Sequence, residues 1–381
     1  MNCLSPHLAD PVVALRKPVA SCQDGLASAI DLVAARALPS HRFLRRSWYE
    51  AALLAYGGNA RTIVITDAGR PMAALPFVRV GPAPAGLAAV PGCYWPFRSF
   101  PVTREAGPPV AAALLDCLGA NLRALRIGPI YDGDPALGWL KLEAQARGWA
   151  VIDRFVADSY LLDMARLRAE GAWPRNSTLR KNRFHEKHLG SHGAVEWQFV
   201  SGEGWDEATF AALALTEEKS WLADRTDLSD AKFSQTGHGL FWRAAAADPV
   251  LAQMMWAAML RIDGRPAAFS FDLNAGPLKY AIANSYDPVY GKHSPGKVLY
   301  YRNLVRALED GMALVDWGAG DMGYKRTIGA AKGPAIRDWL FVRPGICAQA
   351  ARMLANVWRN SGNRPVAAKD NDAVALAGRE A

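Results

Sequence analysis

Hydrophobic and polar positions in the first half of the chain follow an order of spacings that predicts a mixed α/β unit. Aromatic and small apolar residues recur at helical spacing over 42–56, and a β-branched run over 61–66 follows. The turn Asp67-Ala68-Gly69-Arg70 separates that run from a second apolar strand over 71–80, which indicates a hairpin. The remaining pattern predicts a strand over 94–102, a helix over 108–121, a strand over 124–129, a helix over 135–148 and a strand over 149–164.

The same order of elements recurs after residue 200, which predicts a tandem duplication. The turns Gly69-Arg70-Pro71 and Gly264-Arg265-Pro266 occupy matching places in the two halves. We therefore expect two tandem mixed-sheet α/β units over 1–165 and 166–345, and a C-terminal part over 346–381 with an amphipathic helix at 346–359 and a disordered tail. The second unit is predicted as a helix over 206–221, strands over 251–262, 265–274 and 278–286, a helix over 295–310, and strands over 313–317 and 338–342.

The composition is typical of two folded domains, and further features of the sequence indicate the cellular compartment. The 381 residues are 51% hydrophobic and 21% charged, and no apolar run approaches the roughly 20 residues that span a bilayer. Residues 1–20 lack the pattern of a secretory signal, so we expect the chain to stay in the cytoplasm. The five cysteines are scattered without a C-x-x-C pair, which argues against disulfides and zinc, and no metal is expected.

A formal net charge of +8 favours an anionic partner, which is a phosphorylated cofactor, an acidic lipid surface or a nucleic acid. The basic run from Arg175 to Lys187 is either a solvated helix face or a clamp for phosphate. The aromatic residues near it, such as Trp173 and Trp197, are more typical of a core than of a platform for bases. Nucleic acid is therefore not the favoured partner.

The start of the helix predicted over 295–310 is the strongest candidate for a binding site. Ser294 is expected as its N-cap and Pro295 as its first residue, after a strand and a glycine-containing loop. The free backbone N–H groups and the positive dipole end of such a start suit a pyrophosphate. Lys292, His293 and Lys297 add positive charge there. An ordinary capped helix is the alternative interpretation.

A longer pattern surrounds this helix start and carries a family resemblance. It consists of Tyr286-Asp287, Ser294-Pro295-Gly296, Gly311 and Asp316-x-Gly318-x-Gly320-Asp321-x-x-Tyr324-Lys325. A second stretch, over 176–198, joins a basic helix to a strand. Together these stretches resemble the BioF2-like, or CelD-like, acetyltransferases, a branch of the GNAT superfamily related to the Fem aminoacyltransferases. The chain departs from the common pattern at His293, where an aromatic residue is more usual.

The resemblance implies two GNAT-like halves and transfer of an acyl group from a thioester, or in the Fem branch from aminoacyl-tRNA, to an amine. It implies a donor site in the second half, formed by Lys292, Ser294, Gly296, Lys297 and Tyr324. It also implies that Lys325 stabilises the developing oxyanion. Asp321 is expected to orient that lysine. On spacing alone, Lys325 is equally typical of a surface lysine after a turn.

The base that takes the proton of the amine is not fixed by the pattern. Glu217 and His293 are the first candidates, because a histidine has a suitable pKa and a glutamate acquires one when it is buried. Glu218, His238 and Asp287 are further candidates. A solvated position on a helix is the commoner fate of such carboxylates.

The resemblance therefore implies an N-acyltransferase that uses acyl-CoA as co-substrate and a primary amine as acceptor. The leading acceptor is a long-chain amino lipid such as a sphingoid base, with a ceramide-type product, because the basic chain has 13 tryptophans and an Arg-bearing helix at 346–359. Peripheral contact of that helix with the anionic inner membrane is expected. Acylation of an envelope polysaccharide or peptidoglycan amine, a non-catalytic CoA-binding module, and use of aminoacyl-tRNA are the alternatives.

Overall fold

One twelve-stranded sheet runs through the chain, and its order shows the internal duplication. The computed structural model describes residues 17–93, 97–171, 173–226, 228, 230–320 and 324–361. The strands of the first half are β1 (Val19–Asp24), β2 (Ala60–Asp67), β3 (Arg70–Arg79), β4 (Leu87–Ala89), β5 (Ala124–Tyr131) and β6 (Ala150–Asp163). Those of the second half are β7 (Val195–Val200), β8 (Met255–Ile262), β9 (Arg265–Ala275), β10 (Leu278–Tyr286), β11 (Leu314–Ala319) and β12 (Ala331–Val342).

The strand order is β1-β2-β3-β4-β5-β12-β6-β11-β10-β9-β8-β7. The two halves therefore meet in the middle of the sheet, where β12 and β6 lie side by side. In each half the first four strands are antiparallel, whereas the fourth and fifth strands, β4 with β5 and β10 with β11, are parallel. This shared pairing pattern confirms the predicted mixed α/β fold with two tandem units. The boundaries at 165 and 345 stay a prediction.

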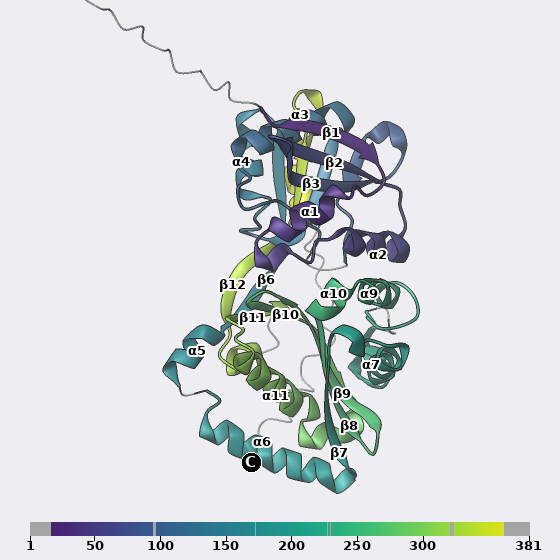
Figure 1. Ribbon diagram of the computed structural model, residues 1–381, viewed down its shortest axis with the longest axis vertical. Coiled ribbons are helices and arrows are strands. Elements are labelled where there is room, and N and C mark those ends of the chain that lie inside the picture. The colour runs from purple at the N-terminus through teal and green to yellow at the C-terminus, as the bar shows by residue number, and fades with distance from the viewer. Residues whose placement is uncertain are drawn as a thin grey trace, which may run out of the picture.

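The sixth strand of each half pairs with the fifth strand of the other half. β6 pairs with β11 of the second half, and β12 pairs with β5 of the first half, while β6 and β12 also pair with each other. In Figure 1 the first half lies above and the second below, and β6 and β12 run from one to the other. The exchange makes the sheet continuous across the junction.

Helices cover both faces of this sheet. The helices of the first half are α1 (Ala29–Arg36), α2 (Arg46–Tyr56), α3 (Pro108–Asn121), α4 (Gly138–Ala146) and α5 (Met164–Glu170). The others are α6 (Asn176–Leu189), α7 (Glu207–Lys219), α8 (Trp221–Thr226), α9 (His238–Ala246), α10 (Pro249–Met254), α11 (Pro295–Glu309), α12 (Tyr324–Thr327), α13 (Ile346–Met353) and α14 (Ala355–Asn360). Short 3₁₀ turns are η1 (Pro39–His41), η2 (Ala83–Ala85), η3 (Gly190–His192), η4 (Gly202–Gly204) and η5 (Pro288–His293).

Alternate residues of β9 assign the helices of the second half to opposite faces. Phe271 contacts Trp242 of α9, and the ring centroids are 4.7 Å apart. The next residue, Asp272, accepts a hydrogen bond from Asn303 of α11 at 2.7 Å. Because neighbouring residues of a strand point to opposite faces, α9 and α11 lie on different sides of the sheet. α7 shares the face of α9, because Phe269 and Phe271 both contact Phe233 beside it.

A shared aromatic core joins the two halves. Trp48 of α2 contacts Phe241 and Trp242 of α9, with ring centroids 4.8 and 5.9 Å apart. The Tyr56 hydroxyl is 2.7 Å from His238 Nδ1 across the same contact. His238, one of the candidate bases, therefore joins the two halves through α2 and α9.

Three local predictions were wrong. The described part of the predicted strand over 94–102 forms only a single bridge, between Val102 and Ala73, while the short β4 was missed. The first residues of the predicted strand over 251–262 are helical, because Asp248 caps α10 and Pro249 begins it. The helix over 346–359 is divided into α13 and α14 at Leu354. The tail beyond 361 lies outside the described residues.

No helix in the part of the chain that the structure describes is long and apolar enough to cross a membrane.

Candidate functional site

Strands β10 and β11 pair over a short stretch and then separate. Leu278–Tyr280 pairs with Leu314–Asp316, after which β10 bulges between Ala281 and Ala283. β11 pairs onward with β6 instead, as far as Ala319. Among the described residues, the β10 edge beyond the bulge therefore has no strand partner on the β11 side. Backbone groups along such an edge can pair with an extended amide chain.

Helix α11 begins beside the far end of β10. Ser294 occupies the N-cap position with a φ of 49°, as predicted, but its side chain does not cap the helix. The first-turn N–H groups are therefore left for another acceptor. A Cβ added to Gly296 would lie 3.1 Å from the Tyr286 ring, so position 296 has no room for a side chain unless that ring moves.

Positive charge gathers at this helix start. Lys292 is exposed, while burial and the neighbouring Lys181 lower the pKa of Lys297. Lys181 comes from α6, which packs against both η5 and α11 and lies across the lower end of α11 in Figure 1. None of these three lysines has an ion-pair partner among the described residues. Part of the basic run thus belongs to the predicted donor site.

Histidines line the same loop. His293 stacks on His188 with ring centroids 5.5 Å apart and contacts His192 at 5.3 Å. Desolvation and these two rings lower the pKa of His293, with Lys292 adding to the effect. In the described part of the chain, no group of three or more histidine, cysteine or acidic side chains has the arrangement of a metal site.

Glu217 is buried at the end of α7, with 1% of its surface exposed. Its Oε2 accepts backbone N–H groups of Lys232 and Phe233 at 2.8 and 3.0 Å. Burial raises the pKa of Glu217 to about 7, against these two hydrogen bonds. A carboxyl that titrates near neutral pH suits a general base, and this role stays a prediction.

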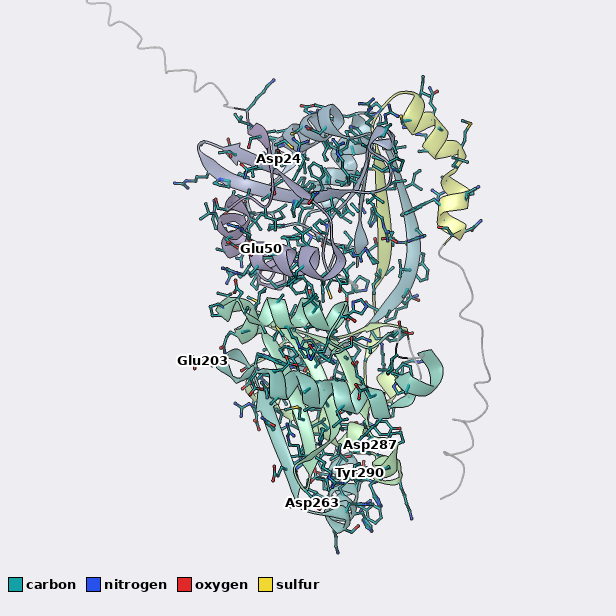
Figure 2. The ribbon with its side chains drawn as sticks, turned by 90° about the vertical axis from the view of Figure 1, so that its right-hand side faces the viewer. Asp24, Glu50, Glu203, Asp263, Asp287 and Tyr290 are labelled. Carbon is teal, nitrogen blue, oxygen red and sulfur yellow. The ribbon has the colours of Figure 1, made fainter. Side chains whose placement is uncertain are left out.

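The other candidate carboxylates have different surroundings. Glu218 is exposed on α7. Asp287 is buried, accepts the N–H of Val289 at 3.0 Å and lies 3.6 Å from Lys219. Figure 2 shows Asp287 and Tyr290 close together in the second half, above Asp263 of the β8–β9 turn. Asp287 therefore caps the 3₁₀ turn η5, which leads to the start of α11.

The Glu217→Gln variant should be more stable than the wild type above pH 7. The folded pKa of about 7 exceeds the ordinary 4.5, so this carboxyl contributes stability below pH 4.5 that is lost as the pH rises through 7. Glutamine keeps the accepting oxygen without the buried charge. We expect a gain on the order of 1–3 kcal/mol near pH 8 that vanishes in acid, measured by urea unfolding.

Glu218→Gln is the matched control, because it makes the same change at an exposed position of the same helix. That control should change the free energy of unfolding by less than about 0.5 kcal/mol. A Glu217→Gln variant that is less stable than the wild type at every pH would contradict the prediction.

Lys325 is buried in α12, with 5% of its surface exposed. Its Nζ donates to the carbonyls of Trp317, Gly318 and Ala319 at 2.7, 3.3 and 2.9 Å. These contacts hold the end of β11 where it leaves β10, a role that the sequence did not indicate. The predicted contact with an oxyanion stays a prediction. Asp321 lies outside the described residues, and of Tyr324 only the backbone is described.

A buried polar network anchors α11 to the sheet. Lys279 Nζ lies 2.8 Å from Asp272 Oδ2, and Asn303 of α11 donates to the same oxygen at 2.7 Å. Trp256 donates its indole N–H to Asn303 at 2.9 Å. Because Asp272, Lys279 and Asn303 are all buried and hydrogen-bonded, the network fixes how the helix start meets β10.

The sequence pattern assigned no role to three residues that line one cavity where the halves join. Asp316 belongs to the quoted family pattern and is buried at the last paired position of β11. Asp134 follows β5 as Asp321 follows β11, so the internal repeat offered a signal for it. His41 lies 2.9 Å from Asp134 and had no such signal.

Comparison with known proteins identifies a family domain in the second half and solved structures with a similar fold. Residues 176–326 match the family model described as the acetyltransferase (GNAT) domain. None of the curated proteins matches the sequence. FemX superposes with a TM-score of 0.58 at 12% identity, covering 87% of this chain and 100% of FemX.

Two further solved structures share the fold. A conserved protein of unknown function from Bacteroides thetaiotaomicron VPI-5482 has a TM-score of 0.53 at 12% identity, over 84% of this chain and 99% of that one. The C-terminal DUF2156 domain of a proposed lysylphosphatidylglycerol synthetase from Agrobacterium fabrum has a TM-score of 0.50 at 15% identity, over 88% and 97%. At these identities the likeness concerns the fold alone.

Proposed function

We propose that this GNAT-type acyltransferase, whose residues 176–326 match the acetyltransferase (GNAT) domain, moves an acyl group from acyl-CoA to a primary amine. The observation that carries this proposal is the separation of β10 and β11 beside an uncapped, lysine-lined helix start. The amine nitrogen bonds to the thioester carbonyl carbon and the amine proton passes to a base. The carbon–sulfur bond breaks, and coenzyme A leaves as a thiolate that is protonated to the free thiol. Glu217 is our first candidate for that base, ahead of His293.

The donor site divides into two parts that match the two ends of coenzyme A. The free edge of β10 after Ala283 offers backbone groups to the amide-bearing arm. The start of α11, with Lys292 and Lys297, offers N–H groups and positive charge to the pyrophosphate. Glycine at position 296 is compatible with this placement, because it puts no side chain at the helix start, where an added Cβ would lie 3.1 Å from the Tyr286 ring.

Gly296→Glu should weaken CoA binding at least tenfold. The new side chain displaces the Tyr286 ring and puts a negative charge where the pyrophosphate is expected. Calorimetric titration with CoA measures the effect. Gly138→Glu in the first half is the matched control, because a Cβ there meets nothing within 4 Å. Unchanged affinity in a folded Gly296→Glu protein would place the donor elsewhere.

An amino lipid is the acceptor that we propose first, in the form of a sphingoid base with a ceramide-type product. The support comes from α13 and α14, which pack on the sheet through Ala348 and Ala355 and leave apolar side chains in solvent. Figure 2 shows the two helices, in yellow, along the outer side of the first half. The exposed apolar side chains are Ile346, Met353, Leu354 and Val357.

Basic residues accompany this apolar surface. Arg352 and Arg359 are exposed on the same helices, where they can meet lipid phosphates. Trp358, by contrast, lies beneath Arg154, whose guanidinium is 4.5 Å from the ring centroid. Trp358 thus packs within the protein, and we do not include it in the membrane surface.

The purified protein should sediment with anionic phosphatidylglycerol vesicles at low salt and be released as salt rises. Replacing Ile346, Met353, Leu354 and Val357 with serine should reduce the bound fraction at least fivefold, because apolar area at the interface is lost. The control replaces four exposed apolar residues of the first half, Val19, Leu32, Leu54 and Leu142, with serine. A protein that ignores vesicles at every salt concentration would shift the proposal to an envelope polysaccharide or peptidoglycan amine.

A further inference from the structure

A cavity of about 240 Å³ lies where the two halves of the sheet meet. Its walls come from η1 and the residues after β5 in the first half, and from the paired starts of β10 and β11 in the second half. Gly133 and Pro334, both exposed, lie at its rim. The cavity therefore connects to solvent.

The charge of the cavity is negative. Asp132, Asp134 and Asp316 line it, whereas no lysine or arginine does. Asp134 is buried and fully occupied, because it accepts from Ser99 and from the Ala136 N–H and lies 2.9 Å from His41. Asp132 lies 2.8 Å from Arg337, at a half-exposed position. Asp316 also lines the cavity, and no lysine or arginine of the cavity wall pairs with it.

Asp316 is 4% exposed, and its Oδ1 accepts the Gly318 N–H at 2.7 Å. Burial raises the pKa of Asp316 to about 6, although the Gly318 N–H, Tyr131 and Lys325 lower it, so the carboxyl is ionised near neutral pH. The buried Tyr131 hydroxyl approaches Asp316 but has no hydrogen-bond partner within range among the described residues. A ligand that donates hydrogen bonds would satisfy both groups.

Aromatic rings form the remaining wall around Tyr280. Its ring centroid lies 4.7 Å from that of Phe97, 6.2 Å from that of Phe43 and 6.3 Å from that of Tyr131. Ring faces attract cations, and the attraction grows when water is excluded. Carboxylates together with aromatic rings are the combination that recognises an organic ammonium group.

The cavity lies on the face of the sheet opposite to α11. Tyr280 and Asp316 are the last paired residues before β10 and β11 separate, and both line the cavity. The neighbouring Lys279 points the other way, toward Asp272 and α11. A donor held at α11 and a ligand in the cavity would thus approach the separated strands from opposite faces.

We propose that the junction cavity binds the ammonium head group of the acceptor between Asp316 and the rings of Tyr280, Phe97 and Phe43. This assignment rests on the proposed N-acyltransferase function and adds the chemical class of the group that enters. The volume accommodates a small head group, and a long chain would extend past the rim.

The test uses serinol, an aminodiol, and glycerol, which replaces its ammonium by a hydroxyl. Saturation-transfer NMR on the full chain should show serinol binding at least tenfold tighter than glycerol. Asp316→Asn keeps the oxygen that accepts from Gly318 and removes the charge, so it should weaken serinol binding at least tenfold. Asp153→Asn is the matched control, because Asp153 pairs with the same Arg337 but does not line the cavity, and it should stay within about twofold of the wild type.

A second variant guards against misfolding of the first. Leu38→Lys, at a 39% exposed rim position, places a competing ammonium at the cavity and should abolish serinol binding. Equal binding of glycerol and serinol, or serinol binding that survives both variants, overturns the assignment. Calorimetry with CoA separates the two proposals: CoA binding without serinol binding refutes only the cavity, and serinol binding without CoA binding refutes only the donor site.

Discussion

Replacing Lys325 with alanine should lower turnover by about a hundredfold or more and also destabilise the protein. The side chain donates to three backbone carbonyls at the end of β11, and alanine removes this shared donor. Loss of the donor to a buried carbonyl costs about 1–3 kcal/mol, so the end of β11 should rearrange. The rearrangement would change the separation of β10 and β11, where the thioester is expected. Steady-state kinetics with acyl-CoA and a primary amine, together with thermal unfolding, measure both effects.

The pattern of losses distinguishes the two roles of Lys325. If it holds the strand end, the midpoint of unfolding falls and CoA affinity weakens along with turnover. A fall in turnover alone, with unchanged stability and donor affinity, would instead support the oxyanion contact predicted from the sequence. The exposed Lys332 provides a control, because its ion pair with Asp158 lies at the surface and its loss should change neither quantity appreciably.

Replacing Asp338 with alanine should cost about 3–5 kcal/mol of unfolding free energy. Asp338 is fully buried on β12 and pairs with Arg126 of β5 at 2.9 Å and with Arg154 of β6. Without it, two guanidinium groups face each other in the middle of the sheet. Since β12 belongs to the second half and β5 and β6 to the first, the loss should also loosen the junction between the halves. Urea unfolding followed by circular dichroism measures the change.

Asp153→Ala is the matched control for this prediction. Asp153 pairs with Arg337 at 2.6 Å, but its side chain is 30% exposed, so its loss should cost less than about 1 kcal/mol. The Asp338 carboxylate packs closely against Gly128, because a Cβ at that position would lie 2.9 Å from Asp338 Oδ1. Equal effects of the two alanine substitutions would show that burial does not strengthen the Asp338 pairs.

Local spacing was sufficient to predict most elements and the duplication. The helix over 108–121 and the strand over 278–286 are confirmed as α3 and β10, because their apolar periods and terminal turn residues are contiguous in the chain. The start of α11 was likewise predicted from Ser294 and Pro295. The missed helix α10 also had a local signal, at Asp248, which the following apolar run concealed.

The tertiary structure alone decided which distant groups meet. The sequence determined the order of the two units, the GNAT-like pattern and a lysine-lined helix start, because each depends on residues close together in the chain. The exchange of β6 and β12, the carbonyl contacts of Lys325, and the placement of Asp134 and Asp316 in one cavity depend on how the two halves pack. Burial then set the pKa of Glu217 and of Asp316, because desolvation arises only when other elements cover a carboxyl.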